Sequence, residues 1–262
     1  MGLTRLTLDL VTVQSARVAR ERGDLVLAPG EVPIGGGTWL YSEPQEATGV
    51  VDLLGMGWEP VTRTGSVLTV AATCTIETLS GLGGFFEQCA DSLLASWKVQ
   101  RIATVGGNIA LALPAGPMTS LAVALDATLV LWTATESRSV PAASFVTGVR
   151  STVLRPGEIL RQIEIPLASL HSTAFRRIAL SPLGRTGTLV TGRTDATGLT
   201  VISVTGGTTR PHRLAFDAPP TAAQVASAVD SIADWYDDAH GSPDWRRAMS
   251  LAFAEEIRAE LA

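Results

Sequence analysis

Lysine and cysteine are scarce in this chain. Lys98 is its single lysine, and Cys74 and Cys89 are its two cysteines. Two cysteines are too few for a disulfide framework, or for a [2Fe–2S] cluster, which takes ~4 cysteine ligands. We therefore expect two reduced thiols in the core, with a single disulfide between them as the alternative. The net charge is −5 and no cluster of basic residues occurs, which argues against a nucleic-acid partner.

Long hydrophobic runs are also missing. The most apolar stretch, residues 109–132, contains two prolines and Asp126 and is therefore not a membrane span. The first ten residues include Arg5 and Asp9 and lack the apolar core of a secretory signal. These features lead us to expect a cytoplasmic protein.

The common catalytic motifs are absent. There is no G-x-x-x-x-G-K-[ST] phosphate loop, no G-x-S-x-G nucleophile turn and no G-x-G-x-x-G after an expected strand. His171, His212 and His240 lie in three separate segments, so they form no ligand pair at helical spacing. We therefore predict no metal site, and nothing in the sequence points to a pair of catalytic carboxylates.

The pattern of apolar residues predicts an α+β fold. The chain has 262 residues, of which 46% are hydrophobic, enough for one large domain or two modest ones. Alternation predicts a hairpin over residues 58–71 and strands over 3–10, 32–34, 50–53, 127–133, 138–140 and 158–165. Helical spacing predicts a turn at 38–42 and helices over 12–22, 75–79, 84–94, 119–125, 221–232 and 243–261. An antiparallel meander is expected over 174–180, 187–194, 197–205 and 213–216, beyond a boundary near residues 166–173.

Two glycine-rich stretches carry the main functional signal. Residues 34–40 read Ile-Gly-Gly-Gly-Thr-Trp-Leu, and residues 104–110 read Thr-Val-Gly-Gly-Asn-Ile-Ala. Glycines let the backbone approach a ligand closely, and flanking threonines supply short polar groups. A Gly-Gly pair alone is also typical of a tight turn. Two such loops facing each other, however, would hold a phosphate or pyrophosphate from both sides through their N–H groups.

These stretches resemble the two FAD-pyrophosphate motifs of the flavin-binding medium subunits of molybdenum hydroxylases. That family includes the medium subunit of aerobic carbon monoxide dehydrogenase and the flavin domain of xanthine dehydrogenase. Its motif Ala-Gly-Gly-Thr-Asp/Ser-Leu is similar to residues 35–40, and Ala-Thr-Ile-Gly-Gly-Asn is similar to residues 103–108. Later segments at 114–116, 140–142, 156–160, 163–166 and 245–261 follow the family's order, so the resemblance covers nearly the whole chain.

The resemblance implies a fold and a cofactor. It implies an FAD-binding domain of the vanillyl-alcohol-oxidase type over residues 1–168, with two α/β subdomains that meet near residues 50–57. A smaller C-terminal α+β domain is then expected over residues 169–262. FAD would be bound by Ile34, Gly35, Gly36, Gly37, Thr38, Trp39, Leu40, Thr104, Val105, Gly106, Gly107, Asn108, Pro114, Gly116 and Leu160. Leu160 and, with less support, Leu94 would lie near the isoalloxazine ring, although a plain core position is the alternative for both.

Three positions depart from the family pattern. Trp39 replaces a small or acidic residue of the first motif. Pro117 stands where many members have an aspartate that contacts the FAD. The family's Tyr-x-Lys pattern near the flavin is matched by Phe175-Arg176-Arg177, which keeps the charge but loses the phenol.

The implied function is electron transfer within a larger oxidoreductase. By resemblance, a separate large subunit carries molybdopterin, a small subunit carries [2Fe–2S] clusters, and FAD on this chain passes the electrons to an external acceptor. The resemblance also implies a dimer of heterotrimers. Two alternatives remain: a degenerate flavin-fold partner that no longer binds FAD, and a stand-alone flavoenzyme. The substrate and the electron acceptor are not predicted.

Overall fold

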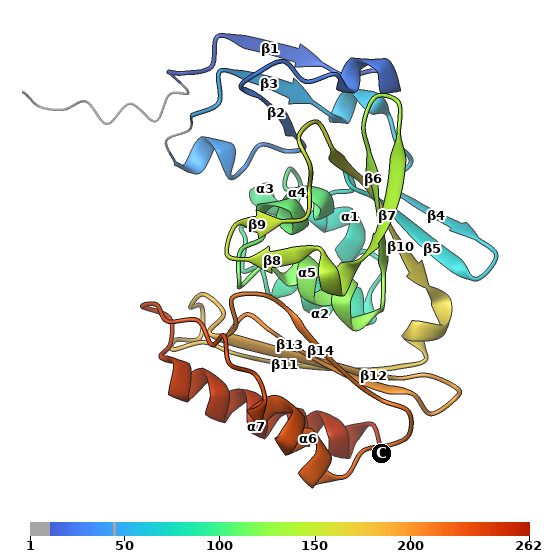
Figure 1. Cartoon of the computed structure of the whole chain (residues 1–262), viewed down its shortest axis with the longest axis vertical. Coiled ribbons are helices and arrows are strands. Elements are labelled where there is room, and N and C mark those ends of the chain that lie inside the picture. The colour runs from blue at the N-terminus through green and yellow to red at the C-terminus, as the bar shows by residue number, and fades with distance from the viewer. Residues whose placement is uncertain (1–10, 44–45) are drawn as a thin grey trace, which may run out of the picture.

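The computed structural model of the chain describes residues 11–43 and 46–262, and the predicted α+β class is confirmed. Three layers follow one another along the long axis of the molecule (Figure 1). A small parallel sheet lies at one end. A five-stranded sheet with its helices lies in the middle, and a four-stranded sheet backed by two helices lies at the other end.

The first sheet contains three parallel strands in the order β1-β3-β2. They are β1 (Ser15–Val18), β2 (Glu31–Ile34) and β3 (Gly49–Asp52), with short 3-10 helices at Arg22–Leu25, Leu40–Ser42 and Leu54–Met56. The helix predicted over residues 12–22 is wrong, because part of that segment is β1. Ala16 pairs with Val50 there, and pairing with β3 outweighs the weak helical spacing of a short segment. The strand predicted over residues 3–10 lies outside the described residues.

The middle sheet is antiparallel, with the order β4-β5-β10-β6-β7. Its strands are β4 (Val61–Thr64), β5 (Val67–Ala71), β6 (Thr128–Trp132), β7 (Ser137–Pro141) and β10 (Ile159–Pro166). The predicted hairpin and the predicted pairing of residues 127–133 with 138–140 are confirmed. A 3-10 helix at Ala142–Ser144 follows β7. It leads to a small hairpin of β8 (Val146–Gly148) and β9 (Ser151–Thr152).

Five short helices pack between this sheet and the C-terminal sheet. They are α1 (Ile76–Ser80), α2 (Gly84–Asp91), α3 (Trp97–Gln100), α4 (Val105–Leu111) and α5 (Pro117–Ala124). The helix predicted over residues 84–94 ends at Asp91, and Leu94 has a φ of 53° that is incompatible with a continuing helix. Both cysteines are free thiols in the main core, as predicted, and burial raises the pKa of Cys74 to about 12.

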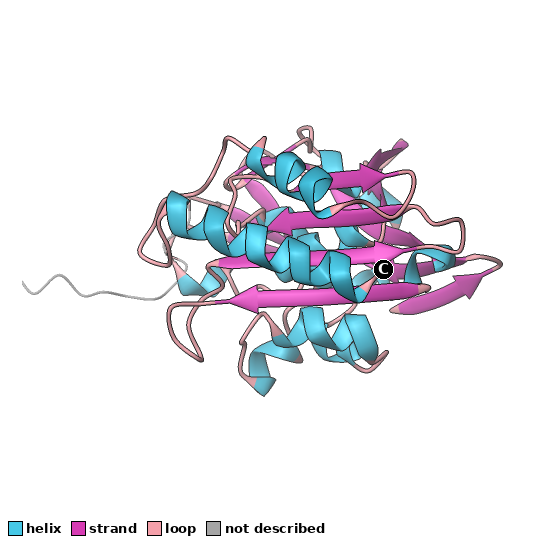
Figure 2. Ribbon diagram, turned by 90° about the horizontal axis from the view of Figure 1, so that it is seen from below, coloured by secondary structure: helices cyan, strands magenta, loops and turns pink. Residues whose placement is uncertain are grey.

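The C-terminal layer is the predicted meander, in the order β11-β12-β13-β14. A 3-10 helix at Leu167–Leu170 leads to β11 (Ser172–Ile178), β12 (Thr188–Thr194), β13 (Thr200–Thr205) and β14 (His212–Phe216), followed by α6 (Ala222–Asp230) and α7 (Pro243–Glu260). Helices α6 and α7 cover the outer face of the sheet (Figure 2), and α2 and α5 pack on its inner face. Consequently β12 and β13 are buried on both faces.

The buried face of α7 differs from the predicted apolar stripe at 245, 249, 253, 257 and 261. Its fully buried positions are Arg246, Ser250, Ala254 and Ile257. The helix approaches β12 so closely that a Cβ on Gly192 would lie 2.2 Å from Ile257 Cγ2. Ile257 of the predicted stripe therefore lies against the sheet together with Arg246, Ser250 and Ala254, whereas the other four predicted positions are only partly buried.

Candidate functional site

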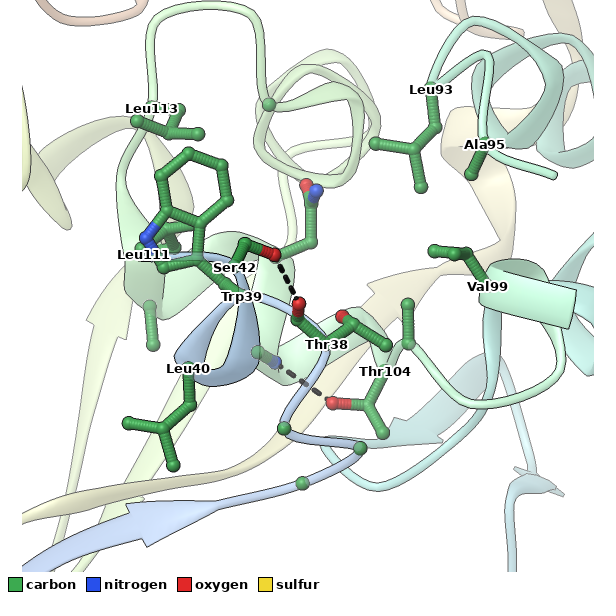
Figure 3. A pocket seen from close by; sticks show the side chains of 18 of the residues that line it. Thr38, Trp39, Leu40, Ser42, Leu93, Ala95, Val99, Thr104, Leu111 and Leu113 are labelled. Carbon is green, nitrogen blue, oxygen red and sulfur yellow. Dashed lines mark hydrogen bonds between the residues drawn. The ribbon is translucent and has the colours of Figure 1, made fainter. Parts of the chain in front are cut away.

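A cavity of about 790 Å³ opens where the three layers meet. It is lined by the segment after β2, by the connection between α2 and α3, by α4 and the residues after it, by Arg150, and by the connection between β11 and β12. In Figure 3, Trp39, Leu111 and Leu113 lie on one side, and Leu93, Ala95 and Val99 lie on the other. The volume falls within the range of about 300–1,000 Å³ that is typical of ligand pockets.

The glycine run after β2 forms the tightest contact with the helical layer. A Cβ on Gly36 would lie 1.7 Å from the carbonyl oxygen of Ile102, and one on Gly35 would lie 2.4 Å from Thr104 Oγ1. These two positions therefore require glycine, since their backbone rests directly on the start of the second motif. Gly37 has a φ of 65°, which reverses the chain into the following 3-10 helix.

The backbone N–H groups of this run are available to a ligand. Those of Gly36, Gly37, Thr38 and Trp39 donate no hydrogen bond to any described acceptor, and all four residues line the cavity. Consecutive N–H groups around a left-handed residue form a concave anion-binding nest. We use "nest" below for residues 36–39.

We expected the second glycine pair to form a loop, but it forms the first turn of α4 (Val105–Leu111). Thr104 is the N-cap residue, and its Oγ1 accepts a hydrogen bond of 3.1 Å from the Gly107 N–H. The N–H groups of Val105 and Gly106 donate to the carbonyls of Cys74 and Ala72, each at 2.9 Å. The first N–H groups of α4 are thus used inside the protein, so the helix adds the positive end of its dipole rather than free donors.

Asn108 contributes a donor from its side chain. Its Oδ1 accepts a hydrogen bond of 3.1 Å from the Met118 N–H, which fixes the orientation of the amide group. The Nδ2 group is left without a described acceptor at the surface of the cavity. The side chain therefore ties α4 to α5 and still offers an N–H to a ligand.

The charge of the cavity is positive although the chain is acidic. Among the described residues, the lining includes Arg150 and Arg185 and no aspartate or glutamate. Arg150 forms an ion pair of 2.9 Å with Glu43, whereas Arg185 has no ion-pair partner among the described residues. Together with the nest, this arrangement favours an anionic ligand.

Eleven of the fifteen predicted cofactor residues line the cavity: Ile34, Gly35, Gly36, Gly37, Thr38, Trp39, Leu40, Thr104, Gly107, Asn108 and Gly116. The other four do not. Val105 and Leu160 are buried in the main core, and Gly106 packs against Ala72, where a Cβ would lie 2.4 Å from the Ala72 side chain. Pro114 faces a much smaller crevice beside the C-terminal sheet. Leu94 does line the cavity.

Several lining residues were not predicted from the sequence. The segment before the second motif supplies Leu93, Ala95 and Val99, and the C-terminal layer supplies Leu183, Arg185 and Thr186. Their spacing carries no periodic signal, because all except Val99, which lies on the short helix α3, come from irregular connections that only the packing of the layers brings together. In the sequence, the one hint of a ligand contact here was the arginine of the Gly-Arg-Thr segment at residues 184–186.

The departures from the family pattern have local explanations. Pro117 occupies the first position of α5, where proline is favoured because its missing N–H is not needed. Phe175 and Arg176 do not line the cavity, and Arg176 pairs with Glu256 and Glu260 on α7. Arg177 does not line the cavity either, but its Nε donates a hydrogen bond of 2.7 Å to Oγ1 of Thr186, which does.

Among residues 11–43 and 46–262, no helix combines the length and the apolar character that crossing a membrane requires.

A family model described as "FAD binding domain in molybdopterin dehydrogenase" matches residues 14–168, more than half of the chain. The glyceraldehyde dehydrogenase medium chain of Sulfolobus acidocaldarius is 35% identical over 89 residues, 34% of this chain and 32% of that protein. The carbon monoxide dehydrogenase medium chain of Hydrogenophaga pseudoflava is 25% identical over 176 residues, 62% of this chain and 61% of that one. Each match therefore spans less than two thirds of the relative's length.

The fold is shared with solved structures over almost the full chain. A chain of reconstituted CO dehydrogenase from Oligotropha carboxidovorans has a TM-score of 0.82 and 21% identity, and the match covers 95% of this chain and 98% of that chain. At this level of identity the likeness concerns the fold alone.

Proposed function

Because the chain belongs to the family of FAD-binding domains in molybdopterin dehydrogenases, we propose that it binds FAD and serves as the electron-transfer subunit of a molybdenum hydroxylase or dehydrogenase. Two relatives of related sequence are named as medium chains, one of a glyceraldehyde dehydrogenase and one of a carbon monoxide dehydrogenase. The nest carries the proposal: its four consecutive residues have N–H groups without a described acceptor, and they line a cavity whose described lining includes two arginines and no carboxylate. A dinucleotide with a pyrophosphate group is the ligand that matches this lining.

The residues present fit this cofactor. The nest and the Asn108 amide would hold the pyrophosphate, with the N-terminus of α4 behind them. The apolar residues on the two sides of the cavity would surround the ring systems (Figure 3). Leu94, which also lines the cavity, would contribute to this apolar surface. When bound, FAD supplies the redox chemistry that connects an iron–sulfur donor to an external acceptor. The chain itself binds the group, orients it and excludes water from its rings.

Partner subunits follow from what the chain can bind. The chain has two thiols, both free and buried in the core, whereas an iron–sulfur cluster is held by ~4 cysteine ligands. We propose that a small subunit supplies the [2Fe–2S] clusters and a large subunit supplies molybdopterin, with the subunits assembled as a dimer of heterotrimers. In this assembly the substrate is oxidised on the large subunit and the electrons leave through this chain.

We also propose the division of labour along the chain. Residues 1–168 would form the FAD-binding domain, with two subdomains that meet near residues 50–57, and residues 169–262 would form the C-terminal domain. The order of the elements supports this division, since the middle sheet ends with β10 at Pro166 and the C-terminal sheet begins with β11 at Ser172. The C-terminal domain would complete the site through the connection that carries Arg185.

The visible absorption spectrum of the purified chain tests the proposal. We expect a flavin spectrum, and FAD in the supernatant after heat denaturation. A colourless chain that takes up no added FAD, alone or with its partner subunits, would contradict the proposal.

A degenerate flavin-fold partner is the second candidate. Trp39 and Pro117 favour it, because each replaces a residue that the family uses near the cofactor. The same spectrum separates the two candidates, since a degenerate partner would co-purify with the complex and carry no flavin.

A further inference from the structure

Trp39 projects from the nest into one side of the cavity. Its side chain is half-buried, and it lies on the same side as Leu111 and Leu113 (Figure 3). These two leucines leave an apolar surface beside the indole ring. A tryptophan at this position is a departure of this chain, so its role does not follow from the family pattern.

The indole ring is fixed by its edge. Its Nε1–H donates a hydrogen bond of 2.8 Å to Glu43 Oε1, and the same oxygen lies 2.9 Å from Arg150 Nη2. Arg150 is in turn held by its backbone N–H, which donates a 2.8 Å hydrogen bond to the carbonyl of Ala112. The polar edge of the indole is thereby used within the protein, which leaves its face as the surface that a ligand can contact.

The backbone that carries the indole is also fixed. The Tyr41 N–H donates to the carbonyl of Gly37 at 3.1 Å, and Ser42 Oγ donates to the carbonyl of Thr38 at 2.6 Å. Trp39 is therefore held in the same short turn as the N–H groups of the nest. A phosphate bound by the nest would bring one of the two rings, carried on the adjoining ribose or ribityl chain, within reach of the indole.

We propose that Trp39, clamped by Glu43 and Arg150, is a stacking wall for a planar heteroaromatic ring of the bound dinucleotide. The inference rests on the proposed function and assigns a part of that site. Aromatic side chains bind such rings through their faces, and the interaction tolerates different ring types. The ring is either the adenine or the isoalloxazine, and both share the flat, polarisable surface that an indole face recognises.

Isothermal titration calorimetry of the flavin-free full-length chain tests the proposal with three ligands: FAD, ADP and FMN. The variants are Trp39→Ala, Trp39→Phe and Glu43→Gln. Trp97→Ala is the matched control, because Trp97 is 63% exposed and does not line the cavity. We expect Trp39→Ala to weaken FAD binding roughly ten-fold or more, with Trp39→Phe in between. Glu43→Gln keeps an acceptor for the indole, so it should weaken binding less than Trp39→Ala.

The ligand series identifies the ring. Weaker binding of ADP with unchanged FMN assigns adenine to Trp39, and the reverse assigns the isoalloxazine. Unchanged FAD affinity in Trp39→Ala, or tighter binding as an obstructing side chain is removed, would overturn the proposal while leaving flavin binding established. A wild-type chain that binds none of the three ligands, alone or with its partner subunits, would instead refute the proposed function, and this inference with it. Far-ultraviolet circular dichroism checks that each variant is folded. If Trp39→Ala does not fold, the FAD affinity of Trp39→Phe decides the proposal.

Discussion

At the scale of single residues, the two glycine motifs have different structural roles. The first motif supplies free N–H groups, whereas the N–H groups at the start of the second are bound to carbonyls and to Thr104. Gly106 is required for packing against Ala72, and Gly35 and Gly36 for packing against residues 102–104. Gly37 is the residue whose conformation shapes the nest, because its positive φ orients the neighbouring N–H groups.

This role predicts the effect of Gly37→Ala. Alanine at a φ of 65° is strained, and its Cβ would lie 2.9 Å from Tyr41 Cε2, so the turn must shift. We expect stability to fall by about 1 kcal/mol, the usual cost of a left-handed residue with a side chain. We also expect flavin to be lost, because the N–H groups no longer converge. Urea unfolding measures the first effect, and the ratio of flavin to protein measures the second.

Gly65→Ala is the matched control for this experiment. Gly65 has a φ of 57° in the turn between β4 and β5, with no atom within 4 Å of an added Cβ. This variant should lose similar stability and keep its flavin. If both variants lost flavin equally, general destabilisation would explain the result and the nest would not.

At the scale of secondary-structure elements, the N-cap of α4 connects stability to the site. Thr104 Oγ1 caps the helix through Gly107, and Thr104 lines the cavity. We expect Thr104→Val to lower the free energy of unfolding by about 1 kcal/mol, the typical value of a lost threonine cap. Flavin affinity should fall as well, since the first turn of α4 frays beside the pyrophosphate.

Thr221 gives the comparison. It caps α6 with a 3.3 Å hydrogen bond from the Gln224 N–H, and α6 packs on α7 and contributes no residue to the described lining of the cavity. Thr221→Val should cost similar stability in urea unfolding and leave flavin affinity unchanged. An equal loss of affinity in both variants would contradict a local role for the Thr104 cap.

The sequence predicted elements well where periodicity was strong and local. The meander from β11 to β14 and the hairpin of β4 and β5 were expected with nearly correct bounds, because alternation and turn residues reinforce each other there. The error at residues 12–22 arose because β1 is short and is extended only through its pairing with β3. The set of buried residues on α7 was predicted incorrectly for a related reason. Which face of the helix is buried depends on its close packing against Gly192 of β12.

The candidate site was predictable only in its contiguous parts. The glycine run and the Thr-x-Gly-Gly-Asn segment can be read from the sequence, because glycine and capping residues have local conformational meanings. Which N–H groups remain free could not be read, since that depends on carbonyls of Ala72 and Cys74 from a different segment. Arg185 and the apolar residues of the α2–α3 connection reach the cavity only through the packing of the layers.

At the scale of the whole molecule, an ion-pair cluster joins the middle layer to the C-terminal sheet. Asp126, just before β6, accepts hydrogen bonds from Arg193 on β12 and Arg213 on β14, including one of 2.8 Å from Arg213 Nη2. Burial alone would raise the pKa of Asp126, but the hydrogen bond from Arg213 and the charges of both arginines outweigh it. The pKa of Asp126 therefore lies below its ordinary value.

Asp126→Asn should loosen this connection. Arg193 is only 4% exposed, so loss of the carboxylate leaves a buried cation with a weaker partner, Asp195, at 3.8 Å. We expect the free energy of unfolding at pH 7 to fall by about 2 kcal/mol, because uncompensated buried charges are costly. Asparagine tolerates the left-handed φ of 50° at this position, so backbone strain does not add to the effect.

The pH dependence separates this ion pair from the other carboxylates. Because the pKa of Asp126 is lower in the folded state, the unfolded state takes up its proton first, and the stabilisation is complete only above a pH of about 4. As the pH falls further through the folded-state pKa, the stabilisation from Asp126 is lost.

Urea unfolding of the wild-type protein and Asp126→Asn from pH 7 to pH 3 should therefore show a difference in stability that is constant near neutrality and shrinks below pH 4. Wild-type protein still loses stability in acid through groups such as Glu31, whose pKa is lowered to about 2 by Arg17, and the variant shares that loss. A difference that stays constant down to pH 3 would show that Asp126 stabilises the junction by shape rather than by charge.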